Sequence, residues 1–162
     1  MQSTIAYLGP HAGLLDWLAG HDIVYEVHEH AVSFTARETA HAEGVDPHTF
    51  AKVVAVTADH RPALIVVDSI DHVDMRKTRH VLGARDVRLL SEEELAQLAP
   101  GCDIGALPAV GQLFGVPMYA DNAVHNDAQI SFNAGSHRFT VRVDRIDWEQ
   151  ATGVSYGDLA ED

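Results

Sequence analysis

Apolar residues recur with the period of a helix in some parts of the chain and with the period of a strand in others. Residues 11–19 place three leucines on one side ahead of a glycine, which predicts a short helix. Residues 23–28 alternate from face to face and predict a half-buried strand. Thr35 and Glu38 have the spacing of a capping box, in which each side chain satisfies a free backbone donor, and they begin a helix that Gly44 ends.

Two apolar runs in the next part of the chain predict a hairpin. Residues 50–57 and 63–67 are strand-like and are joined by the polar residues 59–62, so we expect them to pair antiparallel. The elements expected after them are a helix over residues 74–82, a short strand over residues 87–90 and a second capping box at residues 91–94.

Residues 100–116 break this pattern because six of them are glycine or proline, which predicts a long ordered loop. Strands are expected over residues 116–120, 129–133 and 138–144, with a tight glycine turn between the last two. Hairpins of this kind do not permit a purely parallel sheet. The chain is therefore expected to fold as one α/β domain over residues 1–162, with a mixed, mostly antiparallel sheet and flanking helices.

Length and composition add few limits to this picture. A chain of 162 residues suits one domain, and its longest apolar run, residues 63–67, is far shorter than a membrane span. The first residues lack the basic and apolar regions of a signal peptide. The single cysteine, Cys102, excludes an internal disulfide and fits a reducing compartment, so we expect a cytoplasmic location.

The charge balance is unusual for a protein that would bind nucleic acid. The chain has 11 Lys and Arg against 24 Asp and Glu, a formal net charge of −13, whereas nucleic-acid binders are usually basic. Five basic residues nevertheless fall within residues 76–88, and these form the 76–88 basic cluster: Arg76, Lys77, Arg79, Arg85 and Arg88. The cluster is either a solvated helix face or a local surface for RNA, and the sequence leaves both open.

Lys52 is the most informative single residue. With histidine taken as neutral, it is the one charged side chain between Asp46 and Asp59, and it lies in the apolar run 50–57. An ammonium group is costly in apolar surroundings unless it reaches water, an anion or a carbonyl. Lys52 is therefore either an edge-strand residue that extends to solvent or a cation on a pocket wall that faces a substrate carbonyl or phosphate.

The glycines of residues 100–116 are a second candidate for function. Gly101, Gly105 and Gly111 would let the backbone approach a ligand closely because no Cβ intervenes, although a plain connecting loop also contains glycine. The segment lacks the spacing of a P-loop or of a dinucleotide-binding turn.

Metal and covalent chemistry find little support in the sequence. The 11 histidines are scattered without the paired spacing of metal ligands, so we expect no metal and no cofactor. Cys102 has no neighbouring cation that would activate its thiol, and no serine nucleophile motif is present.

Several short motifs nevertheless occur in a recognisable order. They are His30, Thr35-Ala-Arg-Glu38, Lys52-Val-Val, Leu82-Gly83, Gly105-Ala-Leu-Pro-Ala-Val-Gly111, Pro117-Met-Tyr-Ala-Asp121 and Phe132-Asn-Ala-Gly-Ser-His137. No single motif is specific, but together, from about Tyr25 to Ile146, they resemble the YbaK/ProX editing family, which is related to the insertion domain of bacterial prolyl-tRNA synthetases.

The resemblance implies a barrel-like domain whose pocket holds the aminoacyl end of tRNA and hydrolyses the aminoacyl ester without a metal or a covalent intermediate. In the mechanism it implies, a hydroxyl of the terminal ribose helps to activate water, Lys52 is the catalytic residue that contacts the substrate, and amides of the glycine loop hold the carbonyl. The substrate-binding residues that it implies are His30, Gly105, Ala109, Gly111, Asn133, Gly135 and His137. The implied partners are the acceptor end of a mischarged tRNA and a synthetase, with no DNA and no membrane.

The chain also departs from the family pattern. Val53 replaces the usual threonine after the lysine, Ala109 and Val110 replace a Pro-Phe pair, and Asn133 and His137 stand where some relatives carry serine and arginine. A smaller residue at 110 would enlarge the pocket. Our leading hypothesis is a trans-editing deacylase for tRNA mischarged with a small amino acid. The alternatives are a non-catalytic module that binds RNA ends, a nucleotide or a partner protein, and a hydrolase of another small acyl ester or thioester.

Overall fold

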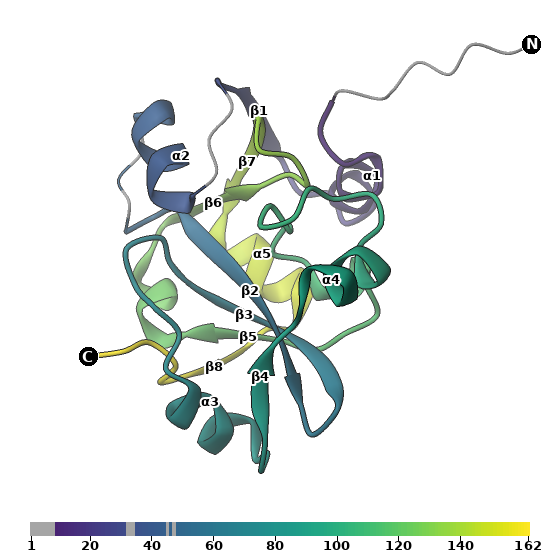
Figure 1. Ribbon diagram of the computed structural model, residues 1–162. Coiled ribbons are helices and arrows are strands. Elements are labelled where there is room, and N and C mark those ends of the chain that lie inside the picture. The colour runs from purple at the N-terminus through teal and green to yellow at the C-terminus, as the bar shows by residue number, and fades with distance from the viewer. Residues whose placement is uncertain (1–8, 32–34, 45, 47) are drawn as a thin grey trace, which may run out of the picture.

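The computed structural model describes residues 9–162 apart from residues 32–34, 45 and 47 (Figure 1). The helices are α1 (Ala12–Gly20), α2 (Ala36–Glu43), α3 (Met75–Leu82), α4 (Glu92–Leu98) and α5 (Arg145–Thr152), with the short 3-10 helices η1 (Gly111–Leu113) and η2 (Asn122–Asn126). The strands are β1 (Tyr25–Glu29), β2 (Ala51–Ala58), β3 (Arg61–Asp68), β4 (Val87–Leu89), β5 (Met118–Asp121), β6 (Gln129–Asn133), β7 (Phe139–Asp144) and β8 (Ser155–Gly157).

The strands form two sheets rather than one. A three-stranded antiparallel sheet has the order β1-β7-β6, and a five-stranded sheet has the order β4-β2-β3-β5-β8. In the larger sheet β2 pairs antiparallel with β3 and β4, whereas β3–β5 and β5–β8 are parallel. The mixed α/β fold is confirmed, but the expected barrel-like closure is too loose a description because the two sheets do not close on each other.

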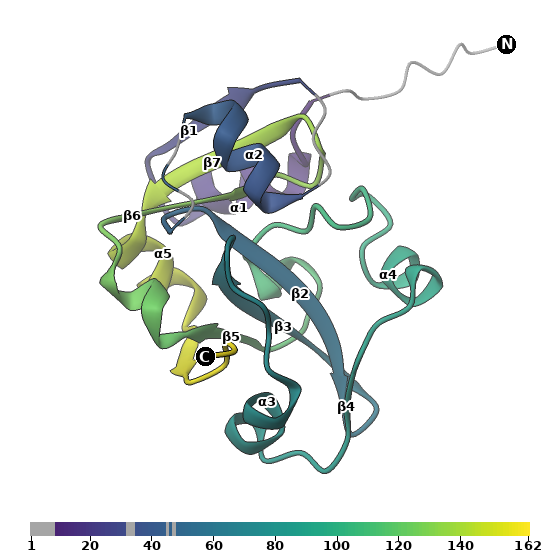
Figure 2. The ribbon, with the colours of Figure 1, turned by 60° about the vertical axis from the view of Figure 1, so that its left-hand side comes forward.

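The sheets are joined where β2 begins. Phe50 forms a parallel bridge with Ser131 of β6, and the Ser131 N–H donates to the carbonyl of Thr49 at 3.1 Å. Leu64 and Phe132, one from each sheet, lie with the indole of Trp148 in a fully buried core cluster. Figures 1 and 2 show the smaller sheet with α1 and α2 at one end of the molecule and α3 at the other.

The predicted hairpin is formed by β2 and β3. Its two turn residues, Asp59 and His60, both have positive φ (48° and 72°), as the mirror-image turn that suits the twist of a hairpin requires. The carboxylate of Asp59 accepts hydrogen bonds from the backbone N–H groups of Arg85 and Asp86, which fixes the chain ahead of β4 against this turn.

Most predicted helix ends are also confirmed. Asp74 caps α3 and Gly83 ends it in the left-handed conformation (φ 65°), and the capping box at Ser91 and Glu94 is present at α4. Thr35 caps α2 by accepting from the Glu38 N–H. In the described part of the chain no helix is long and apolar enough to cross a membrane.

The last residues pack beside the loop between β3 and α3. The Glu161 N–H donates to the His72 carbonyl at 2.8 Å, and Val73 bridges Ala160. The Asp121 carboxylate accepts from the N–H groups of Leu159 and Ala160 at 2.9 and 3.0 Å. This C-terminal segment, residues 158–162, is thus part of the folded domain.

Candidate active site

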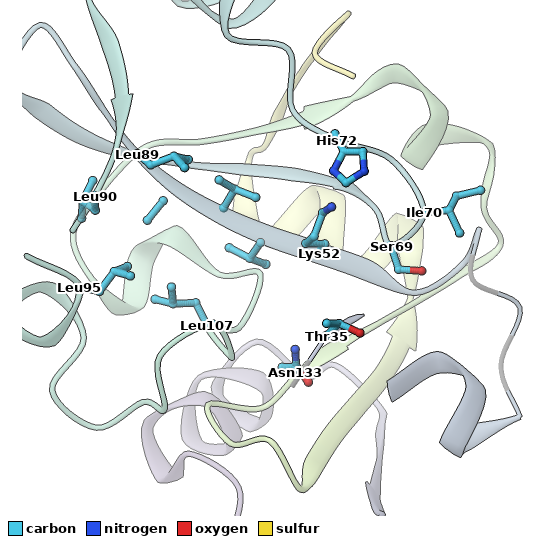
Figure 3. Close-up of a pocket in the computed structure, with 14 residues that line it drawn as sticks. Thr35, Lys52, Ser69, Ile70, His72, Leu89, Leu90, Leu95, Leu107 and Asn133 are labelled. Atoms are coloured by element: carbon cyan, nitrogen blue, oxygen red, sulfur yellow. The ribbon is translucent and has the colours of Figure 1, made fainter. Parts of the chain in front are cut away.

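A cavity of about 530 Å³ opens beside the first half of β2 (Figure 3). Strand β4 pairs with residues 56–58 of β2, and the last bond on this side runs from the Leu90 N–H to the Ala55 carbonyl. The pairing therefore ends before it reaches Lys52, and the cavity lies beyond this point. The described lining comprises Thr35, Lys52, Val53, Val54, Ala55, Ser69, Ile70, His72, Leu89, Leu90, Leu95, Gly105, Leu107 and Asn133.

The cavity has a polar end and an apolar end. Figure 3 shows Lys52, His72, Ser69, Thr35 and Asn133 toward one side, where the apolar side chain of Ile70 also lies. The leucines of the lining lie toward the other side, and they are Leu89, Leu90, Leu95 and Leu107. A ligand that carries a carbonyl or a charged group at one end and an apolar group at the other fits this division.

Lys52 is held at the wall of the polar end. Its side chain is half-buried, and its ammonium donates to the backbone carbonyl of Asp71 in the loop between β3 and α3. Gly105 and Leu107 line the same cavity, so the lysine and the glycine-rich loop face one space although they are some fifty residues apart. Of the two arrangements left open by the sequence, the structure shows the pocket wall.

The glycine-rich loop is fixed from behind by the turn between β6 and β7. The Asp103 N–H donates to the Gly135 carbonyl (2.8 Å), and the Gly135 N–H donates to the Ala106 carbonyl (2.9 Å). His137 adds two bonds, from its backbone N–H to the Asp103 carboxylate (3.1 Å) and from its Nε2 to the Ile104 carbonyl (2.7 Å). Gly135 and His137 therefore lie behind Gly105 and outside the described lining.

Ala109 and Gly111 also lie outside the described lining. Both are buried, and the Ala109 carbonyl accepts from the Trp148 indole N–H at 2.7 Å. A Cβ at Gly111 would collide with the Val116 carbonyl oxygen. The structure thus gives these two residues packing contacts, and their contact with substrate stays a prediction.

His30 lies under α2 rather than in the described lining. Its side chain is only 5% exposed, its Nδ1 bonds to the Ala31 carbonyl at 2.6 Å, and its Nε2 lies 3.8 Å from the Glu43 carboxylate. The same carboxylate accepts from the hydroxyl of Thr140. Of the eight predicted site residues, the structure thus brings Lys52, Gly105 and Asn133 together in one cavity.

Three polar residues of the cavity were missed as site residues by the sequence reasoning. Thr35 was interpreted as a helix cap, a role that it also has, and as part of a family motif, and Ser69 and His72 were not considered. Ser69 directly follows β3, the strand that pairs with β2, and His72 is three residues further on, so their position after a hairpin strand was the available signal.

Cys102, the one cysteine of the chain, is a poor candidate for a nucleophile. Burial raises the pKa of the Cys102 thiol to about 11, so this side chain is protonated at neutral pH and a poor nucleophile. Among the residues that the structure describes, no three histidine, cysteine or acidic side chains are placed to hold a metal ion.

Two members of the 76–88 basic cluster are engaged by acidic side chains. The Lys77 ammonium binds the carboxylates of Asp158 (3.1 Å) and Asp162 (2.8 Å), which raise its pKa. Arg88 forms two hydrogen bonds with the Glu94 carboxylate, at 2.7 and 2.9 Å. The positive charge offered by this cluster is therefore smaller than the sequence suggests.

The fold and the cavity define a class of small α/β domains in which a lysine and a glycine loop share a pocket. A model of the aminoacyl-tRNA editing domain family matches residues 30–151. The chain belongs to this family, which confirms the resemblance to YbaK/ProX proteins.

Its sequence relatives include proline–tRNA ligases. The enzyme of Shouchella clausii is 33% identical over 62% of this chain and 17% of the ligase, and that of Ligilactobacillus salivarius is 32% identical over 68% of this chain and 20% of the ligase. The chain thus corresponds to about a fifth of the length of these relatives.

Solved structures share the whole fold. A crystal structure described as a candidate trans-editing enzyme for prolyl tRNA synthetase has a TM-score of 0.83 and 25% identity, with 96% of this chain and 100% of that chain covered. A larger protein from Marinobacter aquaeolei, described as a candidate signal transduction protein, contains the same fold in 30% of its length, with a TM-score of 0.71 and 20% identity.

Proposed function

We propose that the protein is a trans-editing deacylase that hydrolyses the ester bond of tRNA mischarged with a small amino acid. Its family supports an editing role, and its structural neighbour supports action apart from a synthetase. The observation that carries the proposal is the shared cavity, in which the Lys52 ammonium and the Gly105 loop face the same space.

The cavity offers what ester hydrolysis needs. Its volume of about 530 Å³ is in the range of small-molecule sites, which suits the end of an aminoacylated nucleoside. A cation and backbone donors stabilise the negative charge that develops on an ester carbonyl, and each such donor contributes about 3 kcal/mol. A water molecule held in position against this reactive ester would accelerate the hydrolysis further, because its attack no longer depends on a chance encounter. A hydroxyl of the terminal ribose is the proposed activator of that water.

The decisive experiment is deacylation of a panel of mischarged tRNAs by the wild-type protein and by Lys52→Met. Methionine keeps the unbranched apolar part of the side chain and removes the charged end, so we expect a fall in kcat/KM of about 100-fold with an unchanged fold. Arg61→Gln is the matched control, because Arg61 is an exposed cation at the far end of the same hairpin.

Three other results of this experiment would contradict the proposal. Equal rates for Lys52→Met and wild type would contradict the role of the lysine. Binding of tRNA or a nucleotide without turnover would favour the non-catalytic module. Turnover of small acyl thioesters but of no aminoacyl-tRNA would favour the other hydrolase.

The proposed substrate is the acceptor end of a mischarged tRNA in the cytoplasm, and a synthetase is a proposed partner. We expect activity to survive chelation of divalent cations from the protein, because the described residues gather no set of metal ligands. The test is to dialyse the protein against a chelator and to compare its deacylation rates on the same mischarged tRNA before and after dialysis. A loss that zinc restores would contradict metal independence.

A further inference from the structure

His72 brings an imidazole ring to the polar end of the cavity. It is an exposed residue of the loop between β3 and α3, and it lines the cavity together with Lys52. Figure 3 shows its ring on the same side of the cavity as the Lys52 side chain. The two groups are also linked through the backbone, because the Lys52 ammonium donates to the carbonyl of Asp71, the residue directly before His72. A histidine and a cation thus share the part of the cavity in which we place the ester.

The backbone of His72 is fixed, while its ring is available to a ligand. The His72 carbonyl accepts from the Glu161 N–H at 2.8 Å, and Val73 bridges Ala160, so the C-terminal segment holds this loop at two neighbouring positions. The imidazole forms no hydrogen bond or ion pair with the residues that the structure describes. Both ring nitrogens can therefore reach a substrate without breaking a contact to the described part of the protein.

The polar end needs a group that can move a proton. Ester hydrolysis takes a proton from the attacking water and gives one to the departing ribose oxygen. In the described lining, Lys52 and His72 are the two residues whose side chains titrate, and Lys52 is the cation proposed to hold the ester carbonyl. An imidazole accepts and donates protons in turn near neutral pH, which hydroxyl and amide side chains do not.

We propose that His72 is a catalytic residue that carries a proton from the attacking water to the ribose oxygen of the substrate ester. The inference rests on the proposed deacylase function and assigns a further residue to it. The neighbouring ribose hydroxyl positions the water by a hydrogen bond, and the neutral imidazole takes the proton.

The proton moves in two steps. Water adds to the ester carbon and loses a proton to the imidazole, while the electron pair of the C=O bond moves onto the carbonyl oxygen. The carbonyl then re-forms, the bond to the ribose oxygen breaks, and the imidazolium gives its proton to that oxygen. The products are the free amino acid and the tRNA hydroxyl, and His72 is neutral again.

Other charged groups near this ring also influence a pH profile. They come from β2, from the loop and the helix cap that follows it, and from the C-terminal segment, and they are Lys52, Asp71, Asp74 and Glu161. Asp68, at the end of β3, titrates as well, with a pKa of about 7. All of them remain in a variant of His72, so the ratio of the wild-type rate to the variant rate isolates the contribution of the histidine.

The first test is deacylation by His72→Gln, in which the new side chain is polar but exchanges no proton near neutral pH. We expect kcat to fall about 100-fold with a small change in KM. The ratio of the wild-type rate to the variant rate should be largest above neutral pH and should fall as the pH is lowered, because a protonated imidazole no longer accepts a proton from water. His80→Gln, at an exposed histidine of α3 outside the described lining, is the matched control.

The second test separates proton transfer from packing. His72→Ala leaves space at an exposed position, so imidazole added to the solution should raise the rate of this variant by about 10-fold. The same addition should change the rates of Lys52→Met and His80→Ala little. Thermal unfolding of the His72 variants should match that of wild type, because the residue is exposed.

The outcomes are distinguishable. If wild type hydrolyses an aminoacyl ester and His72→Gln does so equally well, the role of His72 is wrong and the deacylase proposal stands. A ratio of rates that does not vary with pH, or a His72→Ala variant that imidazole does not rescue, also overturns the proton transfer. If wild type hydrolyses no aminoacyl ester, both proposals fall.

Discussion

Asp68, at the end of β3, makes the stability of the fold depend on pH. Its side chain is buried, and this burial, with the nearby carboxylate of Asp127, raises its pKa from 3.8 to about 7. His48 lies 3.7 Å away and offsets part of this effect. The folded state therefore holds a proton on Asp68 at pH values where the unfolded chain has released it.

The free energy of unfolding should consequently fall as the pH rises from about 4 to about 7, and the contribution of Asp68 should then level off. Asp68→Asn mimics the protonated side chain, so this variant should be more stable than wild type at pH 8, by on the order of 2–4 kcal/mol, and nearly equal at pH 4. Denaturant unfolding of both proteins across this range measures the difference. A difference that does not vary with pH would contradict the assignment.

At the residue scale the sequence could predict the solitary cation but not its whole environment. Lys52 is conspicuous because an apolar strand rarely contains an ammonium group. That Asn133 and His72 share one cavity with Lys52 is visible only in three dimensions, because burial depends on segments far apart in the chain. His30 and His137 lie outside the described lining and hold a helix and a loop in place, so their contact with substrate stays a prediction.

At the scale of the elements, the loop after α4 depends on close packing at Gly111. A side chain at this position would collide with the Val116 carbonyl oxygen. The two residues are already held close together, because the Val116 N–H donates to the Gly111 carbonyl. Gly111→Ala should therefore destabilise the protein by about 1–3 kcal/mol, as overpacking does. Gly20→Ala is the control, because a Cβ there meets no atom within 4 Å and should change stability little. Thermal unfolding of both variants measures this, and equal effects would argue against the packing role.

Hairpins and capped helices were predictable because their signals are local. The turn at residues 59–62 and the two serine or threonine caps depend on residues a few positions apart. Helix α5 and strand β8 received no prediction, because this acidic stretch buries chiefly Trp148 and shows no clear apolar period. Their place is set by contacts with distant strands, including the parallel pairing of β8 with β5.

For the whole molecule, the net charge of −13 limits how tRNA can bind. Because Lys77 and Arg88 of the 76–88 basic cluster are paired with carboxylates, few cations are left to contact phosphates. We therefore expect tRNA to bind weakly. The logarithm of the association constant, plotted against the logarithm of the salt concentration, should fall with a slope shallower than about −3. Binding measured at several salt concentrations tests this, and a steep slope that Arg76→Gln and Arg79→Gln reduce would show that the cluster contacts RNA.

The mixed α/β architecture followed from the sequence, whereas its division into two sheets did not. Alternation shows which residues form strands, but the partner of each strand depends on long-range packing. Strand β1 pairs with β7, more than a hundred residues later. Such pairings are set by the core around Trp148 and not by any local signal.

The C-terminal segment bears on the wall of the cavity. Residues 158–162 are tied to the loop that carries His72, and the carbonyl one residue earlier anchors the Lys52 ammonium. Substitutions that break the contacts of residues 158–162 should therefore shift the loop whose carbonyl binds the Lys52 ammonium. A variant altered in residues 158–162 would then change the cavity without touching any residue of its described lining.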